Sequence, residues 1–184
     1  TVVHEDGKWV GYNTDCSGAI AALEASTSLK DKNILILGSG GTAKAIGYGI
    51  KEKGGKLTVT YNRNKERGES LAKELGCQLV HCRDAGTQAI DILINCSPVG
   101  MNPNINETPF LARDFKEGMV VFDSVYNPLE TKLLREAKAA GCTAIPGSEL
   151  FINQAARQFE LFTGQPAPIN AMREVLMGKL KGVS

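Results

Sequence analysis

The sequence predicts an α/β protein of the Rossmann-like, doubly wound type, with a parallel sheet of about six strands and helices on both faces. Two observations support this fold class. Short apolar runs alternate with helical patterns over short connections between residues 34 and 145, the order that βαβ units produce. A glycine-rich turn directly follows the first apolar run, 34–37, as expected at the first βα connection of this fold.

Length and composition limit the chain to one well-cored domain with a small appendage. With 184 residues, 42% of them apolar, it is too short for two full domains. A net charge of +1 gives no electrostatic basis for binding nucleic acid or an anionic membrane. The five cysteines lack C-x-x-C spacing, so we expect no disulfide framework, no metal site and a reducing compartment, cytoplasmic or plastid.

No apolar run approaches the roughly 20 residues that a membrane-spanning helix needs. A charged and then apolar signal segment is also not visible in the sequence. The first residue is Thr1, which lies inside a strand pattern. We therefore expect the sequence to be a piece of a longer protein.

The N-terminal segment predicts a β-hairpin followed by a helix. Apolar runs lie on both sides of Asp6-Gly7, and Asp-Gly between two such runs is a strong signal for a tight hairpin turn. Apolar residues then recur with helical spacing up to about residue 26. Thr14 or Asp15 is expected to begin this helix, and an N-cap role is the plain reading of Asp15.

The central segment predicts six strands, at 34–37, 57–61, 78–81, 89–95, 119–123 and 142–145. Three helices are expected between them, at 43–53, 65–75 and 129–140, each followed by glycine. The stretch 82–88 is ambiguous. Two helices should follow without a further strand, one carrying an apolar stripe between residues 150 and 162 and one at 169–180. These two helices suggest an arm that packs elsewhere.

The turn after the first strand fits a phosphate-binding pattern. Gly38, Gly40 and Ala43 match G-x-G-x-x-[G/A]. In that pattern the first glycine permits the turn, the second admits a pyrophosphate, and the small third residue lets the helix pack closely on the strand. Glycine-rich turns are common, so an ordinary βα turn is an equal alternative from this pattern alone.

The end of the second strand indicates which dinucleotide would bind. An enzyme that uses NAD carries an acid about 20 residues after the glycines, where it accepts hydrogen bonds from the ribose 2′-hydroxyl. This sequence instead has Asn62-Arg63-Asn64, with Arg67 one helical turn further on. Because arginine can pair with a 2′-phosphate, the pattern favours NADP over NAD.

Six blocks of the sequence together resemble the shikimate dehydrogenase family, and the resemblance covers nearly the whole chain. In order, they are Gly-Tyr-Asn-Thr-Asp at 11–15, Gly-Ser-Gly-Gly-Thr-Ala at 38–43, Asn-Arg-Asn at 62–64, Asn-Cys-Ser-Pro-Val-Gly-Met at 95–101, Asp-Ser-Val-Tyr-Asn-Pro at 123–128, and residues 147–154. The tail at 158–164 and the cysteine after Asp15 are similar to the form fused behind a type I 3-dehydroquinate dehydratase.

The resemblance implies a domain order for the chain. A junction hairpin and linking helix would occupy 1–27, an NADP-binding Rossmann-like domain 28–146, and C-terminal helices 147–184. In the family, those helices return to an N-terminal substrate domain that carries a catalytic lysine. That domain is absent from this sequence, so we expect this fragment alone to be inactive.

The same resemblance assigns substrate-side roles. Asp15 would be the catalytic partner of the absent lysine, while Thr14, Asp15, Tyr126 and Gln154 would bind the substrate. The plain alternatives are an N-cap for Asp15, an ordinary half-buried tyrosine for Tyr126 and a solvated helix position for Gln154.

For the cofactor NADP, the glycine-loop pattern, the arginine cluster and the resemblance together predict a set of binding residues: Gly38, Ser39, Gly40, Gly41, Thr42, Ala43, Asn62, Arg63, Asn64, Arg67, Asn95, Ser97, Ser124 and Gly147. The sequence departs from the family at Asn64, where Thr or Ser is usual, although an amide can still donate to a phosphate. A second departure, at 151–153, concerns helix packing.

The function that the resemblance implies is NADP-dependent interconversion of 3-dehydroshikimate and shikimate. Quinate dehydrogenase is a close enzymatic alternative, because its architecture is the same. A catalytically silent NADPH-binding module is an alternative of another class, but such a module would not need Asp15 and Gln154.

Overall fold

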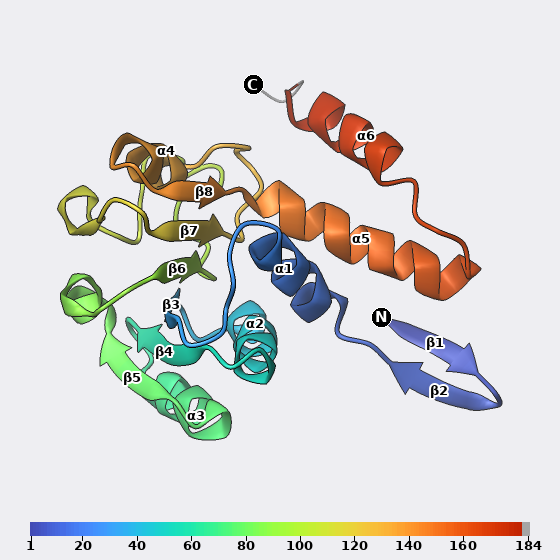
Figure 1. Ribbon diagram of the computed structural model, residues 1–184, viewed down its shortest axis with the longest axis horizontal. Coiled ribbons are helices and arrows are strands. Elements are labelled where there is room, and N and C mark those ends of the chain that lie inside the picture. Colours follow the sequence, from blue (N-terminus) through green and yellow to red (C-terminus); the bar gives the residue numbers. More distant parts are fainter. Residues whose placement is uncertain (182–184) are drawn as a thin grey trace.

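The structure, a computed structural model, describes residues 1–181. Within these residues a six-stranded parallel sheet has the order β5-β4-β3-β6-β7-β8 (Figure 1). Its strands are β3 (Asn33–Leu37), β4 (Lys56–Tyr61), β5 (Gln78–His81), β6 (Ile92–Asn95), β7 (Val120–Asp123) and β8 (Thr143–Ile145). Numbered from β3, this is the order 3-2-1-4-5-6 of the Rossmann fold. The predicted fold class is confirmed.

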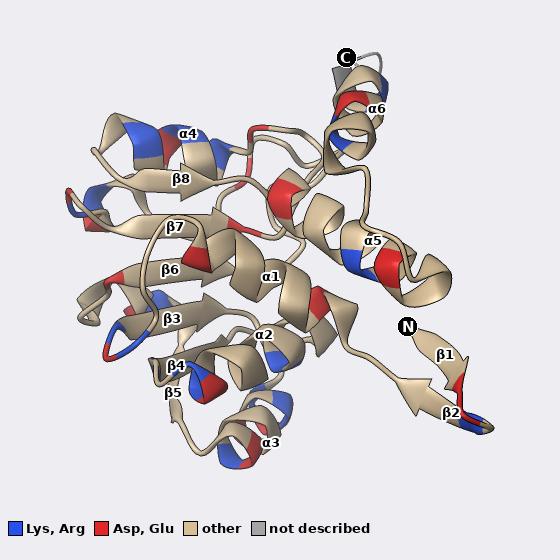
Figure 2. Cartoon of the chain, turned by 45° about the vertical axis from the view of Figure 1, so that its right-hand side comes forward, with Lys and Arg blue, Asp and Glu red and all other residues tan. Residues whose placement is uncertain are grey.

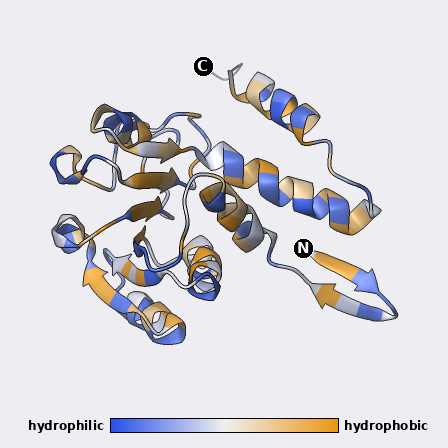
Figure 3. Ribbon diagram, in the orientation of Figure 1, coloured by the Kyte–Doolittle hydropathy of each residue, from blue (hydrophilic) through white to orange (hydrophobic). Residues whose placement is uncertain are grey.

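Helices cover both faces of this sheet. The α-helices within residues 1–181 are α1 (Thr14–Glu24), α2 (Gly41–Glu52), α3 (Lys65–Leu75), α4 (Lys132–Ala139), α5 (Gly147–Thr163) and α6 (Ile169–Lys181). Of these, α6 packs against α5 (Figure 1). Ile34 and Ile36 pack in a core with residues of α1, α2 and α3, whereas Leu35 and Leu37 pack in a second core with residues of α4. The central strands are largely apolar (Figure 3), because both faces are buried.

The hairpin forms as predicted. Strands β1 (Val2–Glu5) and β2 (Lys8–Gly11) pair antiparallel, and Asp6 and Gly7 both have positive φ, at 47° and 78°. Two left-handed residues between paired strands make the type I′ turn, whose twist matches that of the strands. The hairpin projects to one side of the main sheet (Figure 1).

Helix α1 begins at Thr14, as predicted, while its cap and several element boundaries differ from the sequence prediction. Asn13 is the N-cap of α1 and accepts a hydrogen bond from the Cys16 amide, so the N-cap reading of Asp15 is wrong. Strand β6 begins only at Ile92, and the Asp91 side chain before it accepts a hydrogen bond from the Asn33 amide at the start of β3. Helix α4 begins at Lys132 rather than at residue 129, because Thr131 caps it. The ambiguous stretch forms the 3₁₀ helix η1 (Cys82–Thr87).

The C-terminal helices form as predicted. Helix α5 lies against α1 (Figure 1), and the return of these helices to a substrate domain stays a prediction. The two helices meet so closely at Gly18 that a Cβ atom there would lie 2.8 Å from the backbone nitrogen of Gln154. Arg173 of α6 donates two hydrogen bonds to Glu149 in the first turn of α5. The last residues of the predicted segment 147–184 lie outside the described range.

Surface charge is mixed in sign. Acidic and basic residues alternate over the outer helices (Figure 2), and several form exposed ion pairs, as between Lys53 and Glu24. Such pairs contribute little to stability, typically about 0–1 kcal/mol each. Within residues 1–181, no helix combines the length and the apolar character needed to cross a bilayer.

Candidate functional site

A cleft of about 510 Å³ lies outside the carboxyl ends of β3, β4 and β6. We call it the strand-end cleft. Its lining residues are Leu37, Gly38, Ser39, Gly40, Thr60, Tyr61, Asn62, Arg63, Asn64, Arg67, Cys82, Cys96, Ser97, Pro98, Val99, Thr108 and Pro109. Strands β3 and β6 are neighbours in the sheet but the chain leaves them in opposite directions. This is the topological switch point, where open α/β sheets bind their ligands.

The glycine loop forms one wall of the strand-end cleft. Gly38 has φ of 115°, and a Cβ atom there would lie 3.3 Å from the carbonyl carbon of Cys96, so both its conformation and its neighbour favour glycine. Its amide donates to the hydroxyl of Thr60 over 3.0 Å. The N-cap of α2, Gly40, provides no side-chain hydrogen bond. The first amides of α2 therefore remain available to an anion.

The cleft also has a cationic part beside the glycine loop. Arg63 and Arg67 both line the cleft, and Arg67 Nη2 would lie 3.7 Å from a Cβ atom at Gly40. Among residues 1–181, no Asp or Glu lines the cleft, and neither arginine forms a salt bridge there. The Asn64 side-chain oxygen caps α3 by accepting from the Arg67 amide over 2.8 Å. Its amide nitrogen forms no hydrogen bond within residues 1–181, and donation from it to a phosphate stays a prediction.

Asn95 lies at the same sheet edge, but its side chain is completely buried. The amide nitrogen donates to Asp123 and to the carbonyl of Val99, and the oxygen accepts from Ser97. Because both ends of the amide are occupied, the prediction that Asn95 contacts the cofactor is corrected for its side chain. Its role is to hold the turn that begins at Ser97, and Ser97 does line the cleft.

Burial raises the pKa of two titratable groups beside Asn95. It raises the pKa of Asp123, while hydrogen bonds from Thr131, the Val125 amide and Asn95 act in the opposite direction. Burial also raises the pKa of the Cys96 thiol, and the nearby Asp123 charge adds to this effect. Cys96 is thus a neutral thiol and a poor nucleophile.

The remaining predicted cofactor residues differ in position. Gly41 lines a smaller pocket of about 270 Å³ beside the glycine loop, shared with Arg67. Ala43 is fully buried, consistent with close packing of α2 on the sheet. Thr42, Ser124 and Gly147 do not line the strand-end cleft. A Cβ atom at Gly147 would lie 2.7 Å from the Ser124 carbonyl oxygen, so packing within the chain accounts for this glycine.

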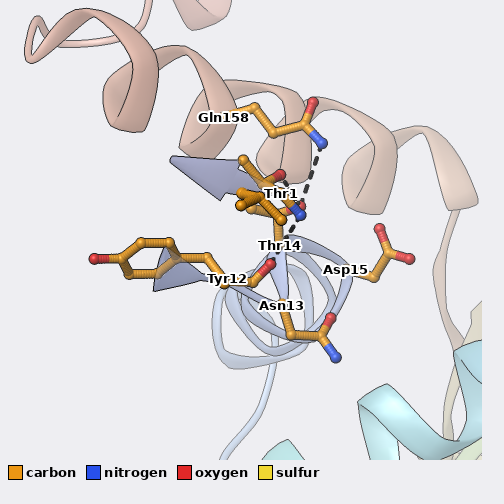
Figure 4. A pocket seen from close by; sticks show the side chains of 8 residues that line it. Thr1, Tyr12, Asn13, Thr14, Asp15 and Gln158 are labelled. Atoms are coloured by element: carbon orange, nitrogen blue, oxygen red, sulfur yellow. Dashed lines mark hydrogen bonds between the residues drawn. The ribbon is translucent and has the colours of Figure 1, made fainter. Parts of the chain in front are cut away.

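A second cleft, of about 570 Å³, lies between the hairpin, the start of α1 and α5. We call it the hairpin cleft. Its lining residues are Thr1, Val2, Gly11, Tyr12, Asn13, Thr14, Asp15 and Gln158. The Thr14 hydroxyl lies 3.1 Å from the Thr1 hydroxyl and accepts from Gln158 Nε2 over 3.3 Å. Figure 4 shows Gln158 reaching from α5 toward Thr14, with the Tyr12 ring directed away.

Asp15 is exposed beside these residues. Its carboxylate makes no hydrogen bond or ion pair within residues 1–181, and the capping of α1 is done by Asn13. Gln154 does not line the hairpin cleft itself but accepts a hydrogen bond from Gln158 over 3.4 Å. Thr14, Asp15 and Gln158 thus line one cleft, and Gln154 is joined to it through Gln158; the substrate-side roles of Thr14, Asp15 and Gln154 stay predictions.

Two further residues qualify the sequence prediction. Gln158 was not among the predicted site residues, although its position four residues after Gln154 places both on one face of α5 and could have indicated it. Tyr126 lines neither cleft. Its ring, 41% exposed, packs against Phe151 with centroids 4.9 Å apart. A substrate contact of Tyr126 stays a prediction.

The strand order, the glycine loop and the acid-free cationic cleft define a dinucleotide-binding protein of the Rossmann type. Residues 20–123 match the family described as Shikimate / quinate 5-dehydrogenase, and residues 147–177 match the Shikimate 5'-dehydrogenase C-terminal domain. The chain therefore belongs to the shikimate/quinate 5-dehydrogenase family.

Individual relatives agree with this membership. Shikimate dehydrogenase (NADP(+)) of Methanosphaera stadtmanae is 38% identical over 99% of this chain and 68% of its own length. The chloroplastic bifunctional 3-dehydroquinate dehydratase/shikimate dehydrogenase of Arabidopsis thaliana is 41% identical over 89% of this chain and 30% of its own length. The crystal structure of shikimate 5-dehydrogenase from Thermus thermophilus, in complex with NADP(H) and shikimate, is 34% identical. Its TM-score is 0.85, over 96% of this chain and 66% of that one.

Proposed function

We propose that this chain is the NADP-binding part of a shikimate dehydrogenase, which interconverts 3-dehydroshikimate and shikimate with NADP. The observation that carries the proposal is the strand-end cleft, where the open N-terminus of α2 lies with Arg63 and Arg67 and where no carboxylate of residues 1–181 lines the cleft. Because the chain spans about two thirds of the Methanosphaera relative and less than a third of the Arabidopsis one, the activity of the whole protein is part of the proposal.

Cofactor choice follows from the charges in the strand-end cleft. The amides at the start of α2 suit the pyrophosphate, and the guanidinium of Arg63 suits a 2′-phosphate at the end of β4. An acid at this position would repel that phosphate, but the sequence has none between Tyr61 and Lys65. Asn64 can donate a further hydrogen bond with its free amide nitrogen. These features support NADP over NAD.

The substrate would lie at the hairpin cleft. Shikimate carries several hydroxyl groups, and Asp15, Gln154 and Gln158 offer the acceptors and donors that hydroxyls need. When bound, NADPH would supply the hydride that reduces the ketone carbon of 3-dehydroshikimate. The alkoxide that forms there requires a proton, and an acid/base group of the protein delivers it. Asp15 would orient the reacting hydroxyl and share in that transfer.

The lysine that the family pairs with this aspartate would come from an N-terminal substrate domain, which we also propose as the partner of the hairpin. Trp9, with 76% of its surface exposed, and Val2, with 59%, are large apolar residues on that hairpin. Exposed apolar surface of this kind is typical of interaction sites. The identity to the Arabidopsis protein supports fusion to a 3-dehydroquinate dehydratase, and with it a plastid or cytoplasmic setting.

Quinate is the alternative substrate, supported by the family description that names both activities. The two substrates differ in their ring substituents, which would be read largely by the part of the relatives that this chain does not match. A silent NADPH-binding module is less well supported, because Asp15 has a free carboxylate that cofactor binding does not need.

Two measurements test the proposal. In a calorimetric titration the chain should bind NADPH, and its affinity for NADH should be much lower. The isolated chain should not oxidise shikimate. A full-length parent protein should oxidise shikimate with NADP. Equal affinity for NADH and NADPH would contradict the cofactor assignment, and turnover of shikimate by the isolated chain would contradict the need for a second domain. Faster turnover of quinate than of shikimate would favour the alternative substrate.

A further inference from the structure

A buried carboxylate joins the loops at the sheet edge. Asp123 ends β7 and is completely buried. Its Oδ1 accepts from Asn95 Nδ2 over 2.9 Å and from the Val125 amide over 3.0 Å, while Oδ2 accepts from the Thr131 hydroxyl over 2.6 Å. These three donors lie at the end of β6, in the loop after β7 and at the start of α4. One side chain therefore holds three segments.

The hydrogen bond from Asn95 links Asp123 to the strand-end cleft. A carboxylate can only accept, so Asp123 forces the Asn95 nitrogen to face it and the Asn95 oxygen to face Ser97. That oxygen accepts from the Ser97 amide over 2.9 Å and from its hydroxyl over 2.7 Å. Ser97, Pro98 and Val99 all line the cleft. The turn at 97–99 is thus shaped through Asn95 by a carboxylate that does not reach the cleft.

The hydrogen bond that the Val125 amide donates to Asp123 holds the loop after β7, which lies next to the start of α5. Val125 follows Ser124, whose carbonyl oxygen would lie 2.7 Å from a Cβ atom at Gly147, the first residue of α5. Helix α5 in turn carries Gln154 and Gln158. Asp123 therefore bonds both to the residue that shapes the turn on the cofactor side and to the loop against which the first residue of α5 packs.

We infer that Asp123 is a positioning residue that holds the turn at 97–99 in the shape required by the nicotinamide half of the dinucleotide. The inference rests on the proposed function for the identity of the ligand. A dinucleotide spans the switch point, and Arg63 at the end of β4 assigns the adenosine 2′-phosphate to that side. The turn after β6 lies on the other side of β3 and therefore faces the other half.

Two probes separate the halves of the ligand. NADPH reaches both sides of the switch point, whereas adenosine 2′,5′-bisphosphate contains only the half that Arg63 would bind. Asp123→Ala should lower NADPH affinity about tenfold, because binding must then order a loosened turn, and should leave bisphosphate affinity unchanged. Asp123→Asn should restore NADPH affinity, because its amide oxygen can still accept from Asn95 and Val125.

A matched pair of variants keeps the test decisive if Asp123→Ala does not fold. Asn95→Ala and Thr131→Val each remove one donor to Asp123, on opposite sides of the carboxylate. Asn95→Ala should weaken NADPH binding selectively, whereas Thr131→Val should lower stability without altering either affinity. Calorimetry on folded protein, verified by circular dichroism, measures all four variants.

The outcomes distinguish this inference from the proposed function. Equal losses for NADPH and bisphosphate in Asp123→Ala or Asn95→Ala would overturn the inference and reduce Asp123 to a general structural role. Unchanged NADPH affinity in those variants, or an equal loss in Thr131→Val, would overturn it as well. A wild-type chain that bound neither probe would overturn the proposed cofactor and this inference together.

Discussion

The strand-end cleft and the hairpin cleft are built in different ways. The strand-end cleft is lined mainly by residues that directly follow buried strands, such as Gly38 after β3 and Asn62 after β4. The hairpin cleft joins Thr14 to Gln158, 144 positions apart, through a hydrogen bond between two helices. The sheet thus positions one cleft, and helix packing positions the other.

The two clefts also differ in how their polar groups are used. Behind the strand-end cleft, the Gly38 amide and both ends of the Asn95 side chain are already hydrogen-bonded within the chain. In the hairpin cleft, the Asp15 carboxylate makes no such bond in the described part of the chain. The backbone behind the strand-end cleft is thus held by bonds within the chain, with Arg63 and Arg67 in front of it, while the polar group that the hairpin cleft presents is the Asp15 carboxylate. Substitutions in the two clefts should therefore have different consequences.

The largest effect is expected at Asp15. In a full-length parent protein, Asp15→Asn should lower the rate of shikimate oxidation by about 10²- to 10⁴-fold, the usual contribution of general acid/base catalysis. NADPH affinity should not change, because Asp15 lies outside the strand-end cleft. Steady-state kinetics and calorimetry measure the two quantities.

Asn13→Ala is the matched control for that substitution. Loss of the N-cap should cost about 1 kcal/mol of stability, whereas Asp15→Asn should leave the helix intact. If Asp15→Asn lowered stability and left the rate unchanged, Asp15 would have no catalytic role.

Arg63→Ala should have the next largest effect, in the other cleft. A hydrogen bond to a charged group contributes about 1.5–3 kcal/mol, so NADPH affinity should fall about 10- to 150-fold while NADH affinity changes little. Some affinity for the phosphate should remain through Arg67. Arg63→Asp should weaken NADPH further and strengthen NADH. Calorimetric titration with NADPH and NADH measures these affinities, and Arg113→Ala, at an exposed position, is the control. Equal losses of affinity for both cofactors would mean that Arg63 only shapes the loop.

Thr60→Val tests whether the glycine loop of the strand-end cleft is held in place by the Thr60 hydroxyl. Thr60 is buried, and its hydroxyl accepts the Gly38 amide, so valine would leave that amide without a partner, at a cost of about 1–3 kcal/mol. Thr58→Val on the same strand is the control, because no side-chain hydrogen bond of Thr58 is formed within residues 1–181. Urea unfolding compares the two. Equal stability of both variants would show that the Thr60 bond is not needed to hold the glycine loop.

The smallest effect concerns pH. Burial raises the pKa of Asp123 above its ordinary value, so the folded chain binds the proton more tightly than the unfolded chain. Stability from this group is then present at low pH and is lost as the pH rises from the ordinary carboxyl range through the raised pKa. The stability of wild type relative to Asp123→Asn should fall over that interval. Urea unfolding at a series of pH values measures it, and a relative stability that rose with pH would contradict the raised pKa.

The sequence was sufficient for the parts of the molecule that depend on local pattern. Apolar runs such as 34–37 predicted the strands, and glycines and arginines directly after them predicted the strand-end cleft. Elements whose ends depend on side-chain contacts were less accessible. Asn13, Thr14 and Asp15 are all good N-caps, and only the backbone conformation at residue 13 decides among them.

The hairpin cleft was harder to predict, because its geometry comes from tertiary packing. The apolar stripe of α5 indicated a buried face but not that α1 would cover it. The burial of Asn95 likewise depends on Asp123, which lies 28 positions away. A single polar residue at a strand end can face a ligand or support a loop, and the sequence pattern is the same in both cases.

The close contact at Gly18 fixes the distance between helices α1 and α5. Helix α1 is held in the same way on its other side, where a Cβ atom at Gly49 of α2 would lie 2.8 Å from the Cys16 sulfur. At both contacts the missing side chain sets the separation, so α1 cannot roll about its axis without driving atoms into a neighbouring helix. Even one methyl group at position 18 would widen the pair and stretch the bond between Gln158 and Thr14. The distance between Gln158 and Thr14 in the hairpin cleft thus depends on two glycines, Gly18 and Gly49, that do not line the cleft.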